Sequence, residues 1–94
     1  MLALPSELTQ QQAAGCLNDL CQGIHTAPGK EVEINASALK KFDSSALAVL
    51  LACQREAIAA RKTMKVREMP LRLQELAVLY GISELIPTMP AAAA

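Results

Sequence analysis

The stretch KKFDSSALAVLLACQ at residues 40–54 decides the fold of this chain. Nearly every residue from 46 to 53 is apolar, which predicts a helix that is buried over much of its circumference. The polar triplet at residues 43–45 comes directly before this run, and Asp and Ser commonly cap the first turn of a helix. We therefore expect a central helix over residues 44–61 that begins at this triplet.

Short strand-like and helical segments alternate on both sides of the central helix. Before it, Thr9 and Gln12 form a T-x-x-Q capping box that opens a helix running to about Gly23. After it, a third helix follows Pro70 and ends at Gly81, which suits a left-handed cap. The strand-like segments are residues 1–4, 31–36 and 63–69. This order predicts an α/β fold with a mixed sheet, its strands at least partly parallel, and with helices packed mainly on one face of the sheet.

Length and composition exclude several kinds of function. The 94 residues, 52% of them hydrophobic, suit one compact domain, which we place at residues 1–87, with a flexible Pro/Ala-rich tail at 88–94. Nine basic residues balance nine acidic ones and aromatic residues make up only 2%, so we expect no binding of nucleic acid. No apolar stretch reaches the roughly 18 residues that span a bilayer, so we expect no membrane insertion and a cytoplasmic location.

Residue types that carry catalysis or bind metals are few and scattered. Cys16, Cys21 and Cys53 lack the CxxC spacing of a metal or redox site and lie in apolar stretches, so we expect buried thiols. His25 is the only histidine, and its Gly/Pro-flanked position at the end of the first helix is typical of a surface loop. We therefore expect no metal site, no cofactor and no enzymatic activity.

The start of the central helix is the first candidate site. Asp43, Ser44 and Ser45 would lie where free backbone amides and the positive end of the helix dipole favour an anion. An acidic group of a partner protein, or a phosphate added to Ser44, would be stabilised there. The same residues also fit an ordinary helix cap worth about 1 kcal/mol, with no role beyond the fold.

The third helix offers a second candidate surface. Leu73, Leu76, Ala77 and Tyr80 recur at helical spacing and would face the core. Three further apolar residues fall outside this stripe and would form an exposed, partner-binding patch: Leu71, Val78 and Leu79. The alternative is that the closing segment ISELIP folds back over part of this patch.

These segments together resemble the STAS domain family. FDSSALAVLL at residues 42–51 is similar to the family's signature, in which an Asp followed by Ser or Thr opens the helix after a strand. The similarity continues in order and spacing through VEINASALKKFDSSALAVLLACQREA and LRLQELAVLYGISELIP, and it covers about residues 3–87. Within the family, LQELAVLYGISELIP looks most like the MlaB-type STAS subunit of the Mla phospholipid-transport ABC system of Gram-negative bacteria.

The resemblance implies how such a chain would act. An MlaB-type subunit binds the ATPase subunit of its ABC transporter at the cytoplasmic face of the inner membrane, in phospholipid trafficking that maintains outer-membrane lipid asymmetry. Its functional hydroxyl would fall on Ser44, after the shared Asp43 and beside Ser45. In the anti-sigma-factor antagonists of the same family, the equivalent Ser is phosphorylated and the partner is an anti-sigma factor kinase. That signalling role is the alternative.

Two departures from the family pattern affect what we expect. Ala46 stands where the family often has Gly, which would stiffen the helix start and restrict close approach to its backbone. Family members also usually have a strand before the one that we place at residues 1–4, and no equivalent segment precedes it here. We therefore expect an exposed sheet edge, through which two copies could pair as a homodimer.

Overall fold

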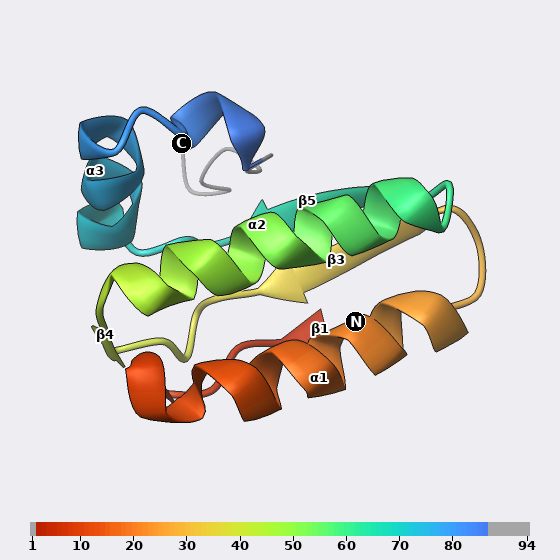
Figure 1. Cartoon of the computed structure of the whole chain (residues 1–94), viewed down its shortest axis with the longest axis horizontal. Helices are drawn as coiled ribbons and strands as arrows, with labels where there is room; N and C mark the ends of the chain where they lie inside the picture. Colours follow the sequence, from red (N-terminus) through yellow and green to blue (C-terminus); the bar gives the residue numbers. More distant parts are fainter. Residues whose placement is uncertain (1, 87–94) are drawn as a thin grey trace.

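The computed structural model describes residues 2–86, in which strands and helices alternate in an α/β fold (Figure 1). A three-stranded sheet has the order β1-β3-β5, where the strands are β1 (Leu2–Ala3), β3 (Glu31–Asn35) and β5 (Thr63–Arg67). A two-stranded sheet joins β2 (Glu7–Leu8) to β4 (Lys41–Phe42). All of these strand pairs are parallel, whereas the sequence predicts a mixed sheet. The physical reason is that a helix crosses between each strand and its partner.

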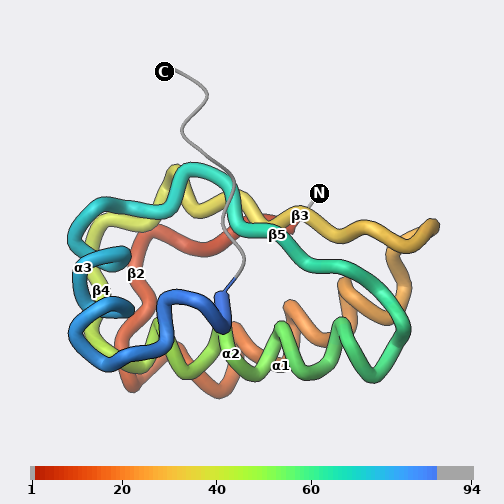
Figure 2. The backbone as a smooth tube through the Cα atoms, turned by 90° about the horizontal axis from the view of Figure 1, so that it is seen from above, coloured from red at the N-terminus to blue at the C-terminus, as the bar shows by residue number. Residues whose placement is uncertain are grey.

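Helices cover one face of the three-stranded sheet. This part of the chain forms α1 (Gln10–Thr26), α2 (Ser44–Ala59), α3 (Leu71–Leu79) and a short 3-10 helix, η1 (Ser83–Leu85). α1 and α2 lie side by side on the same face, and α3 stands at one end of the molecule (Figures 1 and 2). The predicted α/β class and one-sided helix packing are therefore confirmed. The predicted tail at residues 88–94 lies outside the described residues.

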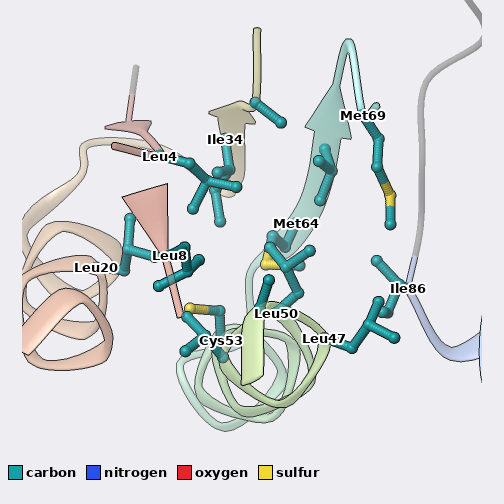
Figure 3. Packing of buried hydrophobic residues seen from close by; sticks show 14 of the residues in the cluster. Leu4, Leu8, Leu20, Ile34, Leu47, Leu50, Cys53, Met64, Met69 and Ile86 are labelled. Atoms are coloured by element: carbon teal, nitrogen blue, oxygen red, sulfur yellow. The ribbon is translucent and has the colours of Figure 1, made fainter. Parts of the chain in front are cut away.

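The hydrophobic core lies between the sheet and the two long helices (Figure 3). Val32 and Ile34 of β3, like Met64 and Val66 of β5, are buried, as the alternating pattern predicts. From α2, Leu50 points into this layer and has no exposed surface. The apolar stretch that predicts a central helix thus fills the middle of the fold.

The first helix continues past its predicted end. Lys62 explains the extension, because its ammonium group donates to the carbonyl oxygens of Ile24 at 2.5 Å and Ala27 at 2.6 Å. A cation at this position also complements the negative end of the helix dipole. His25 therefore lies in the last turn of α1 and not in a loop, and its Nε2 is 2.8 Å from Oε2 of Glu56 on α2.

Two further expectations about side chains are wrong. Cys53 is buried as predicted, and burial raises the pKa of its thiol to about 12. Against the prediction, Cys16 and Cys21 are only partly buried, because they lie at the edges of the apolar stripe of α1. Tyr80 is 57% exposed because α3 ends before it. The turn that follows is as predicted, since Gly81 has a φ of +72° in the left-handed region.

Candidate functional site

The pairing of β2 with β4 brings the starts of α1 and α2 together. Leu8 pairs with Phe42 at the end of these strands, and each strand leads within two residues into a helix. The two helix N-termini therefore lie next to each other, although they are far apart in the sequence. β2 and β4 have no counterpart among the predicted strands, because two residues are too few to show an alternating pattern.

Asp43 caps both helices with a single carboxylate. Its Oδ1 accepts a hydrogen bond from the backbone N–H of Ser45 at 2.8 Å, and its Oδ2 accepts one from the backbone N–H of Gln10 at 3.2 Å. These bonds, above all the one from Ser45, hold the pKa of the Asp43 carboxyl below its usual value, while desolvation opposes the shift. The ordinary capping role that the sequence leaves open therefore belongs to Asp43.

Ser44 is left free of this capping role. It is the first residue of α2 and is exposed, and within residues 2–86 its hydroxyl is not engaged in a hydrogen bond. Ser45 is partly buried, and Ala46 is fully buried with its methyl group in the core. The triplet thus presents the hydroxyl of Ser44 at a helix N-terminus, where backbone amides favour a polar or anionic group.

The three apolar residues of the α3 patch are all exposed. The exposed fractions are 69% for Leu71, 65% for Val78 and 78% for Leu79. Residues 82–86 of the closing segment leave these three side chains exposed, and Ile86 is itself buried in the core. The patch is divided between two faces: Leu71 and Val78 are seven residues apart and share one face of α3, while Leu79 lies about 100° further round the helix.

Leu79 lines a groove between α3 and the segment that leads into α2. The other lining residues are Lys40, Lys41, Phe42, Arg72, Glu75 and Leu76. Phe42 directly precedes Asp43, so the groove adjoins the start of α2. The sequence analysis assigns these basic residues no role, although the KK pair before FDSS is a signal for two of them, Lys40 and Lys41.

The opposite ends of α1 and α2 carry the remaining notable polar contact. Nε2 of His25 lies within hydrogen-bond distance of Oε2 of Glu56 there, with side chains 52% and 43% exposed. Within residues 2–86, no group of three or more His, Cys, Asp or Glu side chains is placed to hold a metal ion. None of the helices in this part of the chain has the length and apolar character needed to cross a bilayer.

Two solved structures of STAS domain proteins have a fold similar to that of this chain. An anti-sigma-factor antagonist (STAS) domain protein from Planctomyces limnophilus has a TM-score of 0.75 and 14% identity, covering 92% of this chain and 77% of that one. The anti-sigma factor antagonist SpoIIAA in its unphosphorylated form has a TM-score of 0.66 and 18% identity, covering 97% of this chain and 78% of that one. At such identities the likeness establishes a shared fold.

The family follows from the sequence itself. The chain belongs to the MlaB-type STAS family, because the family model described as "Mlab, STAS domain" matches residues 1–87. No curated protein matches the chain. STAS domains generally act as non-enzymatic regulatory or accessory domains that interact with partner proteins, and no enzymatic family was found.

Proposed function

We propose that the chain is a non-enzymatic accessory subunit that binds and regulates the ATPase of a Mla-type ABC transporter. It would lie in the cytoplasm, held at the inner membrane through the transporter, and act in phospholipid trafficking and outer-membrane lipid asymmetry. The observation that carries the proposal is the exposed Ser44 at the start of α2, next to the groove lined by Leu79. The match to the MlaB-type family supports a transporter ATPase as the partner.

The start of α2 can recognise a partner without covalent chemistry. Asp43 fixes two helix N-termini, so Ser44 offers a hydroxyl that both donates and accepts from a defined position. Apolar contacts would come from Leu79 and, on the next face of α3, from Leu71 and Val78. Binding that prefers one conformation of the ATPase would shift its equilibrium towards that conformation and so change its rate of hydrolysis.

Replacing Ser44 with arginine tests this contact. A long cation at the positive end of the helix opposes the dipole and blocks approach to the α2 start. We expect Ser44→Arg to abolish co-purification with the Mla ATPase subunit of the same organism. The ATPase rate should return to the value measured without the chain. Unchanged binding and an unchanged rate would count against the proposal.

Thr63→Arg is the matched control. It adds the same cation at another exposed hydroxyl residue, at the start of β5. Because β5 follows the C-terminal end of α2, this position lies at the opposite end of the helix from Ser44. We expect this variant to bind the ATPase like the wild type. An equal loss in both variants would contradict a specific contact at Ser44.

The second candidate function is that of a phosphorylatable anti-sigma-factor antagonist. The observation that favours it is again the exposed Ser44 hydroxyl, because a phosphate on the first residue of a helix is stabilised by the backbone amides and the dipole. An anti-sigma factor kinase would then be the partner. Mass spectrometry of protein taken from cells separates the two functions: phosphate on Ser44 supports signalling, and co-purification with an ABC ATPase supports transport.

The edge of the three-stranded sheet is a further surface. β1 lies at one end of the order β1-β3-β5, and its outer backbone groups, which are few because β1 has only two residues, would pair with those of a second copy of the chain. Such a homodimer remains a prediction. Sedimentation equilibrium would test it, and a monomer mass at every protein concentration would contradict it.

A further inference from the structure

The groove between α3 and β4 carries an excess of positive charge that the fold itself does not use. Lys40 and Lys41 line it from the segment before α2, and Arg72 lines it from the first turn of α3. Within residues 2–86, the two contacts at salt-bridge distance join Glu56 to His25 and Glu33 to Arg67, so neither involves these three basic residues. Among the described residues that line the groove, Glu75 is the only acidic one, so their net charge is positive.

The same groove exposes apolar surface between its charged groups. Phe42 and Leu76 are half-buried there, and Leu79 is 78% exposed. Arg72, Leu76 and Leu79 share one face of α3, because they are four and three residues apart. Apolar side chains flanked by basic ones complement a segment that has an apolar face and acidic flanks.

We propose that this groove binds an amphipathic helix of the partner protein, whose apolar face covers Leu79 and whose flanking carboxylates face the three basic residues. A helix fits better than an added strand, because β4 has only two residues and offers few backbone groups for pairing. The inference rests on the proposed function, in that this helix belongs to the protein that contacts Ser44.

An anionic lipid surface is the competing occupant. Electrostatic binding to membranes usually relies on clusters of about four to eight basic residues. The groove has three, Lys40, Lys41 and Arg72, which is fewer than such a cluster. A groove also suits an inserted helix better than a flat bilayer. The charges and the shape therefore favour a protein segment.

A designed peptide tests the groove directly. The probe is a fluorescein-labelled helix of about 20 residues, long enough to fold, with leucines at i, i+3, i+4 and i+7 and glutamates on its flanks. A control peptide carries lysines in place of the glutamates. Fluorescence anisotropy with the full chain should show saturable binding of the acidic peptide, about tenfold tighter than that of the basic peptide.

Charge reversal assigns this preference to the groove. Lys41→Glu/Arg72→Glu should remove or invert the preference for the acidic peptide. Lys30→Glu/Lys65→Glu makes the same change in net charge at exposed positions outside the groove, and it should leave the preference unchanged. All four residues are exposed, and circular dichroism melting curves verify that both variants fold.

Several results would overturn the inference. These are equal affinity for the two peptides, no saturable binding of the acidic peptide, or a preference that survives reversal of Lys41 and Arg72. Binding to phosphatidylglycerol vesicles without binding to the peptide would assign the groove to lipid instead. If Ser44→Arg abolishes ATPase binding while the Lys41/Arg72 reversal does not, the groove inference fails and the proposed function stands. If neither variant affects the ATPase, the proposed function itself fails, while the peptide result still decides the groove.

Discussion

The helices α2 and α3 are both rich in apolar residues, but the fold uses these residues in opposite ways. The buried residues of α2 are Ala46, Leu47, Val49, Leu50, Cys53 and Ala57. In α3 only Leu73 and Ala77 are buried, while three large apolar side chains face solvent: Leu71, Val78 and Leu79.

The difference comes from where each helix lies. α2 has α1, β5 and α3 as neighbours, so it meets other elements on several sides (Figure 1). α3 stands at the end of the molecule and packs mainly against α2 and η1. Its outward leucines add little to the core, which is why we assign them to the binding of a partner. Position in the fold, more than apolar content, therefore separates a structural helix from a binding one.

Leu50→Ala should have the largest effect on stability. Leu50 has no exposed surface, so truncation removes buried contacts and leaves a cavity, which should lower the free energy of unfolding by about 3 kcal/mol. Leu79→Ala is the matched control on α3, where the same truncation of a 78% exposed side chain should change stability by less than about 0.5 kcal/mol. Urea unfolding measures both. Similar losses in the two variants would contradict the comparison.

Gly81→Ala should have a smaller effect, at the end of α3. Gly81 has a φ of +72°, and the backbone N–H groups of Gly81 and Ile82 donate to Val78 and Ala77, both at 2.9 Å, to close the helix. An L-residue is strained in this conformation, so we expect a loss of about 1 kcal/mol in thermal or urea unfolding.

Gly15→Ala provides a control of opposite sign. Gly15 lies within α1, and an added methyl group there would have no atom within 4 Å to clash with. The same substitution should therefore stabilise the chain by up to about 1 kcal/mol, because Ala loses less backbone entropy in a helix than Gly does. If both substitutions destabilise the chain, the left-handed conformation at Gly81 is not the cause of the loss of stability in Gly81→Ala.

Much of this fold could be predicted from the sequence, because its signals are local. The alternation in β3 and β5, the apolar run of α2 and the glycine after α3 depend on neighbours within a few residues. The predicted end of α1 lies too early in the chain, because the carbonyl groups at the true end bind Lys62, which lies far along the sequence.

The candidate site was predictable only in part. The triplet at residues 43–45 identifies the helix start, but the second bond of Asp43 reaches Gln10, 33 residues earlier in the chain. That contact depends on the pairing of β2 with β4, which are too short to leave a pattern in the sequence. The groove likewise joins Lys41 to Arg72 across separate elements, so its basic lining became visible only in three dimensions.

Asp43→Asn should have the smallest effect, and one that depends on pH. In the folded chain, hydrogen bonds from Ser45 and Gln10 hold the pKa of Asp43 below its unfolded value of about 3.9. The ionised carboxylate therefore stabilises the fold above that pH, and this contribution is lost as the pH falls through the folded pKa. Asparagine keeps an oxygen for the Ser45 amide but has no charge, so it should be less stable than the wild type near neutral pH.

The difference between wild type and Asp43→Asn should then shrink as the pH is lowered below about 4. Urea unfolding across this range measures it, with Asp19→Asn as a control at an exposed carboxylate on α1. A difference that stays constant with pH would show that charge has no part in fixing the start of α2. The N-cap of α3 is Pro70, which makes no side-chain cap hydrogen bond. Protonation of Asp43 at low pH should therefore speed amide hydrogen exchange at the start of α2 and leave exchange at the start of α3 unchanged.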